Sequence, residues 1–305
     1  MPNPNEATPL PTLDPGFIYR EQLQTEGQSQ APNPDNPVWG IGGALLIWVV
    51  TILLQAITPA LLLIPYAAQR LNPNSPNFAR EFLEFAATDR SALFLQVFAI
   101  LPSHILIFAL LWAFVTRFGK RPFLASLGWG WSGRLRFWGS VGLGVVLFAA
   151  ATAIVKLLGA EKPTQLEQLV NSSIGARYMI AALAVFTAPF VEEFTYRGVL
   201  YSALQRTIGV RGAVVFVLAL FTLIHVPQYW PNLGVIAAVG LLSIVLTVVR
   251  ARTGRLLPCV LIHLVFNLIQ AVLLIIEPYA QRMLPTNQPA PTINILLFFG
   301  SFFFN

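Results

Sequence analysis

Long apolar runs limit what this chain can fold into more than any other feature of its sequence. Most of them are long enough to cross a bilayer as a helix, and polar loops separate them. The 305 residues are 56% hydrophobic and only 10% charged, whereas a soluble domain carries about 25% charged residues. A bilayer that replaces water as the solvent explains this shortage of charge. The sequence therefore predicts an all-α, polytopic transmembrane helix bundle.

The bundle is predicted to have seven or eight spans. Apolar runs cover residues 39–68, 91–115, 137–158, 178–204, 212–226, 233–249 and 256–276, and a last run, 292–304, is short for a full span. A short helix at the membrane surface is expected over 78–87. Trp129, Trp131 and Trp138 predict an aromatic belt at the interface between membrane and water.

Four regions follow from this pattern. Residues 1–37 are rich in proline and amide side chains and bury too little apolar surface to fold, so they predict a disordered tail. Residues 38–177 hold the first three spans and their loops, 178–276 hold the membrane core described next, and 277–305 form a C-terminal loop with the short apolar run. The net charge of +6 lies in loops between apolar runs, which argues against a nucleic-acid partner. The distribution of Lys and Arg over these loops favours a cytoplasmic location for both termini.

The fourth apolar run contains three charged side chains. Glu192, Glu193 and Arg197 lie inside it, and each charge costs roughly 2.5–3.5 kcal/mol at the centre of a membrane helix. On a helix Glu193 and Arg197 are four residues apart and share one face, which predicts an ion pair. Glu192 points about 100° away from Glu193 and lacks that partner. We therefore expect Glu193 and Arg197 to hold the structure, and Glu192 to carry chemistry.

Two later runs carry polar residues at helical spacing. Phe221 and His225 are four residues apart, as are His263 and Asn267, so each pair shares a helix face. Polar side chains in a membrane turn toward protein or trapped water, which predicts that these residues and Glu192 line one cavity, with Phe221 as a wall. A carboxylate beside an imidazole can activate water, and a histidine with an asparagine can stabilise an oxyanion. Together they are the parts of an amide hydrolase that needs no covalent nucleophile.

Residues from about 182 to 270 resemble the CAAX-protease and bacteriocin-processing family, a group of intramembrane proteases similar to type II CAAX prenyl endopeptidases. Its three motifs, Glu-Glu-x-x-x-Arg, Phe-x-x-x-His and His-x-x-x-Asn, occur here in order. The local context also fits, although Tyr196 stands where the family usually has phenylalanine. The segment Arg252-Thr-Gly-Arg-Leu-Leu-Pro258 resembles the family's entry to the last motif.

The resemblance implies roles for the matching positions. Glu192 and His225 would activate water, His263 and Asn267 would form the oxyanion site, and the remaining pair would keep the site in shape. The resemblance also implies membrane-associated proteins or peptides as substrates, with prenylated CAAX-type chains as one class. The sequence thus predicts an endopeptidase that works within the membrane.

A metal site is the main alternative for the chemistry. Glu192, His225 and His263 are residue types that bind zinc, although the chain has no His-Glu-x-x-His motif. We expect catalysis without a cofactor and keep a divalent metal such as zinc as the alternative. His104, in the second run, is expected to be a packed or interfacial histidine. Cys259 is the single cysteine, so it cannot form an internal disulfide.

The alternative for the function is a non-catalytic membrane protein, a transporter or a scaffold that retains the polar cavity. Transporters commonly show internal repeats with broken helices in both halves of the chain. The polar residues singled out here are instead confined to the second half. This distribution favours the endopeptidase.

Overall fold

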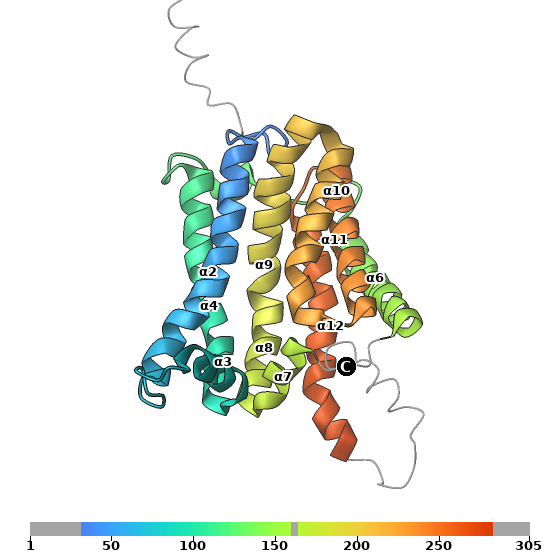
Figure 1. The fold of residues 1–305 in the computed structure, drawn as a ribbon. Helices are drawn as coiled ribbons and strands as arrows, with labels where there is room; N and C mark the ends of the chain where they lie inside the picture. The colour runs from blue at the N-terminus through green and yellow to red at the C-terminus, as the bar shows by residue number, and fades with distance from the viewer. Residues whose placement is uncertain (1–31, 160–163, 283–305) are drawn as a thin grey trace, which may run out of the picture. The chain divides into compact units, whose positions relative to one another are not determined.

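The computed structural model describes residues 32–159 and 164–282, and this part of the chain is built from helices and loops (Figure 1). The predicted all-α fold is confirmed. The elements are α2 (Ile41–Ala67), α3 (Phe78–Thr88), α4 (Arg90–Thr116), α5 (Phe123–Ser126), α6 (Phe137–Leu158), α7 (Gln165–Ser172), α8 (Ile174–Phe186), α9 (Ala188–Glu193), the π-helix η1 (Phe194–Leu200), α10 (Tyr201–Tyr229), α11 (Leu233–Thr253) and α12 (Leu257–Arg282).

Six helical stretches in the described residues are long and apolar enough to cross a membrane. One of them, Ile174–Tyr229, is 56 residues long, about twice the length that a single crossing needs. It turns back at Gly209, whose φ of 75° lies in the left-handed region that favours glycine. The stretch therefore crosses twice, first through α8, α9 and η1 and then through α10 (Figure 1). The seven predicted spans are thus present, and the eighth, 292–304, lies outside the described residues.

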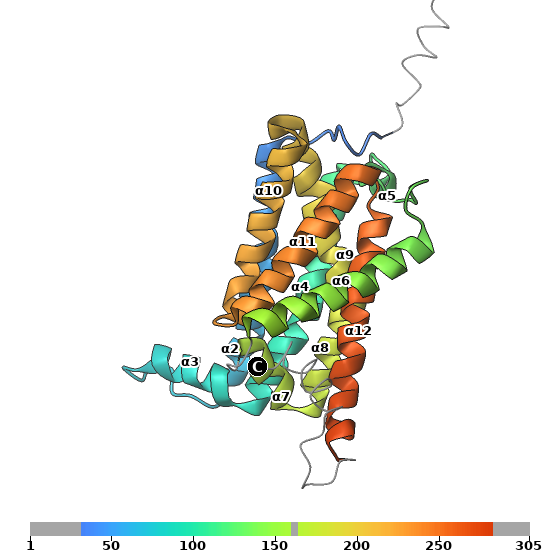
Figure 2. The same cartoon turned by 90° about the vertical axis from the view of Figure 1, so that its right-hand side faces the viewer.

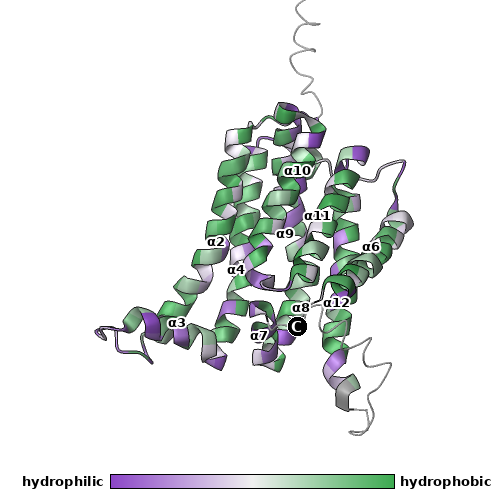
Figure 3. Cartoon of the chain, turned by 45° about the vertical axis from the view of Figure 1, so that its right-hand side comes forward, coloured by the Kyte–Doolittle hydropathy of each residue, from purple (hydrophilic) through white to green (hydrophobic). Residues whose placement is uncertain are grey.

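Two predicted runs extend further in the structure, and the predicted surface helix is present. The fifth run, 212–226, continues as helix through Pro227 to Tyr229, because a membrane helix tolerates a proline whose freed backbone groups find other partners. The seventh run extends to Arg282, so residues 277–282 continue α12 and do not form a loop. The predicted surface helix is α3, which buries none of its side chains in the protein. Apolar residues cover the outer faces of the long helices, and polar residues gather near their ends (Figure 3).

The fourth span is not one continuous α-helix. Thr187, between α8 and α9, has a φ of −126°, which lies outside the helical range although its ψ of −45° does not, and Pro189 at the start of α9 has no N–H to donate. After Glu193 the chain widens into the π-helix η1, all of whose residues are buried. Single π-helical turns occur often at functional sites. The charged stretch thus lies where the regular helix is interrupted on both sides.

The basic loops lie at one end of the bundle. We call this end of the bundle the basic end, because Asp35 is the one carboxylate that the described residues place there. The basic end carries Arg117, Lys120, Arg121, Arg134, Arg136, Arg206, Arg211, Arg250, Arg252 and Arg255. The opposite end carries α3 and α7 and mixes acidic with basic side chains (Figure 1).

The chain enters the bundle at the basic end through a short anchored segment. Asp35 forms an ion pair of 2.7 Å with Arg250, whose side chain is fully buried. Arg206 donates to the carbonyl of Pro37 at 2.9 Å. Residues 33–37, which the sequence assigned to the tail, therefore belong to the helical part. Residues 1–31 of the predicted tail lie outside the described residues.

The predicted tryptophan belt is correct for two of its three members. Trp131 and Trp138 are exposed and make edge contacts with Phe137 at the start of α6. Trp129 instead turns inward and packs edge-on against Phe194 of η1, at 5.8 Å between ring centroids. Burial of a large ring against another aromatic side chain is favourable, which explains why Trp129 leaves the surface.

Candidate active site

One cavity of about 320 Å³ lies between the helices and is lined by all the residues that the sequence assigned to catalysis. Glu192 enters it from α9, His225 from α10, and His263 and Asn267 from α12. Phe221 of α10 forms part of the wall, as expected. The cavity extends from Glu192 toward the end of the bundle that carries α7, because Leu166 and Leu169 of α7 also line it.

The two adjacent carboxylates have different surroundings. The side chain of Glu193 is fully buried, whereas that of Glu192 is 21% exposed and lines the cavity. Glu193 receives a hydrogen bond from Nη1 of Arg197 at 2.9 Å, which gives the predicted ion pair four residues apart. Glu192 has no Arg or Lys partner among the described residues, and Nε2 of His263 lies 3.8 Å from its Oε2. Only Glu192 can therefore meet a water or a substrate without a rearrangement of the core.

Arg197 is bonded along its whole guanidinium group. Nε donates to the hydroxyl of Thr247 at 3.3 Å, and Nη2 donates to the carbonyl of Ser243 at 2.9 Å and to its hydroxyl at 3.1 Å. The ring of Phe221 lies under the guanidinium carbon, 4.7 Å from the ring centroid. A buried cation is tolerated when it is paired and hydrogen-bonded in this way. Arg197 thus ties η1 to α11 and to the cavity wall.

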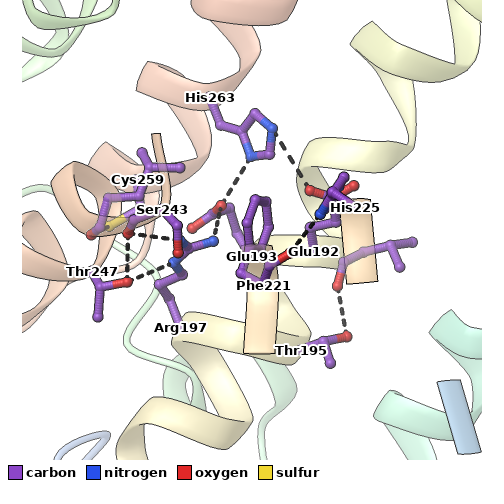
Figure 4. Close-up of polar contacts among 12 residues, drawn as sticks. Glu192, Glu193, Thr195, Arg197, Phe221, His225, Ser243, Thr247, Cys259 and His263 are labelled. Carbon is purple, nitrogen blue, oxygen red and sulfur yellow. Dashed lines mark hydrogen bonds and ion pairs between the residues drawn. The ribbon is translucent and has the colours of Figure 1, made fainter. Parts of the chain in front are cut away.

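His263 lies between the two carboxylates (Figure 4). Its Nδ1 is 2.9 Å from Oε1 of Glu193, and its Nε2 is 3.8 Å from Oε2 of Glu192. Since Oε1 of Glu193 also accepts from Arg197, this carboxylate is the acceptor and Nδ1 of His263 carries the hydrogen. Glu193 therefore holds the imidazole ring in one orientation and directs Nε2 toward Glu192 and the cavity. Spacing along the chain did not predict this contact.

His225 and Asn267 are each fixed by a backbone carbonyl. Nδ1 of His225 is 2.6 Å from the carbonyl of Phe221, and the ring stacks on Tyr229 at 6.4 Å with 10° between the planes. Nδ2 of Asn267 donates to the carbonyl of Ala184 in α8 at 2.8 Å. His225 keeps Nε2, and Asn267 keeps its second N–H, for other partners. Whether Glu192 and His225 share a water stays a prediction.

Two further polar residues that line the cavity, His104 and Gln270, were not assigned to it by the sequence analysis. His104 is buried, as expected, but it also lines the cavity and shares a 2.7 Å hydrogen bond between Nδ1 and the hydroxyl of Thr187 at the helix break. Gln270 lines the cavity, and its Nε2 is buried without a hydrogen-bond partner among the described residues. It lies three residues after Asn267, a spacing that shares a helix face and could have revealed it.

Helix α7, whose Leu166 and Leu169 line the cavity, carries a carboxyl group, Glu167, that does not itself line it. Thr164 and Glu167 form a capping box at its first turn, in which the hydroxyl of Thr164 accepts from the amide of Glu167. Burial raises the pKa of Glu167, the amide of Thr164 opposes this shift, and Glu277 adds to it. The neutral form of Glu167 is therefore favoured at a higher pH than for a free carboxyl group.

The structure does not assemble the alternative zinc ligands. Among the described residues, no group of three or more His, Cys, Asp or Glu side chains is placed to hold a metal ion. Nδ1 of His225 and Nδ1 of His263 already have partners, so each ring could offer only Nε2. A metal held by Glu192, His225 and His263 stays the alternative, and the mechanism proposed for this site does not depend on one.

The ion pair leads to a prediction about stability. Arg197→Met should lower the amount of folded protein more than the double change Glu193→Gln, Arg197→Met does, because the single change leaves a buried carboxylate uncompensated. Loss of one partner of a buried pair costs roughly 3–5 kcal/mol. The abundance of each variant in the membrane and its thermal unfolding in detergent measure the difference between the single and the double variant. Arg80 and Glu84 of α3 are also four apart but exposed, so the same changes there should have little effect. Equal accumulation of the single and double variants would show that the pair is not structural.

Comparison with known proteins supports the family seen in the sequence. Residues 174–269 match the family model described as Rce1-like, type II CAAX prenyl endopeptidase Rce1-like. No curated protein and no solved structure matches the chain. The match begins at α8 and ends within α12, so it includes Glu192, His225, His263 and Asn267 but not His104 or Gln270. The family resemblance is thus confirmed, and the helices that carry these four residues are the part of the chain that matches the Rce1-like type II CAAX prenyl endopeptidases.

Proposed function

We propose that the chain is an intramembrane endopeptidase that hydrolyses peptide bonds by means of a water activated by Glu192. One observation carries the proposal: Glu192 is an accessible carboxylate without an Arg or Lys partner among the described residues, and it faces the same cavity as His225, His263 and Asn267. The Rce1-like match supports CAAX-type protease activity in general. The cavity lies among membrane-spanning helices, which suits a substrate held in or at the bilayer.

The residues divide the reaction among them as follows. Glu192 takes a proton from a water that Nε2 of His225 positions, and the water attacks the carbonyl carbon of the scissile bond. The negative charge then develops on the carbonyl oxygen, where the free N–H of Asn267 and Nε2 of His263 stabilise it. Collapse of this intermediate breaks the C–N bond, and Glu192 returns the proton to the leaving amine. No bond forms between enzyme and substrate.

The contact between Glu193 and His263 determines how His263 can act as a donor in this scheme. Glu193 occupies Nδ1, so Nε2 can donate only when the ring carries both protons. In this scheme the ring donates from Nε2 in its doubly protonated form, while Glu193 and its ion pair with Arg197 hold the ring in place. We therefore assign Glu193 a role in positioning His263 in addition to its ion pair.

The substrate class in this proposal is a membrane-associated protein or peptide. Leucine, isoleucine, valine and phenylalanine side chains from several helices line much of the cavity, for example Leu183, Val239 and Phe266, and they suit an apolar segment of the substrate. A prenylated CAAX-type chain is the narrower class that the family name suggests. The unpartnered amide of Gln270 offers a hydrogen bond to a substrate carbonyl.

The test of the catalytic proposal is Glu192→Gln. This change keeps the shape of the side chain and removes the base, so peptide cleavage by the reconstituted protein should fall by at least ~10²–10⁴-fold. Glu84→Gln, an exposed carboxylate on α3, should leave the rate unchanged. Reagents directed at serine or cysteine should also leave it unchanged, since Cys259 is buried and outside the scheme. A near wild-type rate for Glu192→Gln, or a trapped acyl-enzyme, would rule the mechanism out. Activity lost on chelation and restored by zinc would instead support the metal alternative.

Asn267 and Gln270 should differ in the kinetic constant that they affect. Asn267→Ala should lower kcat by roughly 10²–10³-fold, as loss of one oxyanion donor usually does. Gln270→Leu should raise KM and change kcat little, because its amide would bind the ground state and the transition state alike. Steady-state kinetics on one peptide substrate separates the two effects. A change in kcat alone for Gln270→Leu would contradict its role in substrate binding.

We also propose that the basic end faces the cytoplasm, because Lys and Arg favour that side. The α7 end of the cavity then faces the opposite side of the membrane. Cysteines introduced in a Cys259→Ser background test this orientation. An impermeant maleimide added to sealed cells should label Asn74→Cys, between α2 and α3, and should label Gly133→Cys only after permeabilisation. The reverse labelling pattern would contradict the orientation.

A further inference from the structure

An apolar groove runs between α6 and α11 near the basic end and lies outside the catalytic cavity. It has a volume of about 530 Å³ and is open along one side. Figure 2 shows α6 crossing α11 on the face of the bundle that carries the groove. Its apolar walls are Leu135, Leu143, Ile244, Val245, Val248 and Val249. None of the catalytic residues contributes to it, and the proposed reaction makes no use of it.

Two arginines form the polar end of the groove. Arg134 and Arg252 both line it, and Nη1 of Arg134 donates to the carbonyl of Arg252 at 3.5 Å, so the guanidinium group of Arg134 lies beside the backbone of Arg252. Both residues are exposed, and neither forms an ion pair with a carboxylate among the described residues. Asp35, the one carboxylate that the described residues place at this end, is paired with Arg250. Two cations at the end of an apolar groove without a counter-charge suit an anionic ligand.

The aromatic side chains beside the groove indicate its depth in the membrane. Trp131 and Trp138 are exposed on either side of Arg134 in the sequence and contact Phe137 at the start of α6. Exposed tryptophans gather at the level of lipid headgroups. The arginines therefore lie at headgroup level, and Leu143 and Ile244 lie deeper, along the membrane-spanning parts of α6 and α11.

We propose that this groove binds an anionic phospholipid of the leaflet at the basic end. The phosphate group would lie between Arg134 and Arg252, and one acyl chain would lie along Val245 and Val248. Basic pockets between membrane helices bind acidic headgroups through the same combination of charge and apolar surface. The inference concerns a lipid site and holds whether or not the catalytic proposal is correct.

Native mass spectrometry of the full chain in mild detergent tests the site. Phosphatidylglycerol and phosphatidylcholine with identical acyl chains are added at equal concentration. The wild-type protein should retain phosphatidylglycerol in preference. Arg134→Gln with Arg252→Gln should reduce this preference roughly thirtyfold, because each cation near the surface contributes separately. Lys120→Gln with Arg121→Gln removes the same charge from the same end, away from the groove, and should leave the preference intact.

Two further arms separate a lipid site from a simple anion site. Val248→Trp fills the groove and keeps both arginines, so it should also weaken retention of phosphatidylglycerol. Glycerol phosphate, which has the charge but no acyl chain, should not displace the bound lipid. Equal retention of both lipids by the wild type, an undiminished preference in the arginine variant, or full displacement by glycerol phosphate would each overturn the proposal. If the arginine variant does not fold, Val248→Trp and the competition decide the question.

Discussion

A fully buried carboxylate, Glu193, is the constraint on which the rest of the site depends. A charge in the interior of a membrane protein is costly unless it is paired and hydrogen-bonded, and Oε1 of Glu193 accepts from both Arg197 and His263. Oε2 of Glu193 is buried without a hydrogen-bond partner among the described residues. Arg197 in turn needs acceptors, which Ser243 and Thr247 of α11 supply. One buried charge therefore links the fourth span, α11 and α12.

This linkage leaves the neighbouring carboxylate available for chemistry. Since Glu193 satisfies both Arg197 and Nδ1 of His263, Glu192 is left to face the cavity. The break at Thr187 and the π-helix after Glu193 interrupt the regular helix around the two residues. The same geometry turns Nε2 of His263 toward the side on which a substrate would bind. The division between a buried carboxylate and one that faces the cavity thus follows from the packing of three helices.

Helical periodicity made most of the site predictable. The spacing from Glu193 to Arg197, and from His263 to Asn267, needed only the period of a helix, and the cost of polar groups in a membrane implied one cavity. The contact between Glu193 and His263 joins residues 70 positions apart and depends on how helices pack, which no local pattern encodes. The pair of Asp35 with Arg250 was missed for the same reason. Trp129 was assigned to the surface because its sequence neighbours are interfacial, whereas a partner in η1 draws it inward.

The central claim is that Glu192 is accessible to water and carries the chemistry, while Glu193 is buried and holds the structure. A water-soluble carbodiimide with a small amine, followed by peptide mapping, measures this difference directly on the native protein in detergent. The account predicts that Glu192 is modified, that peptidase activity falls in proportion, and that Glu193 reacts only after denaturation. Modification of Glu193 as fast as Glu192, or complete modification of Glu192 with full activity, would contradict it.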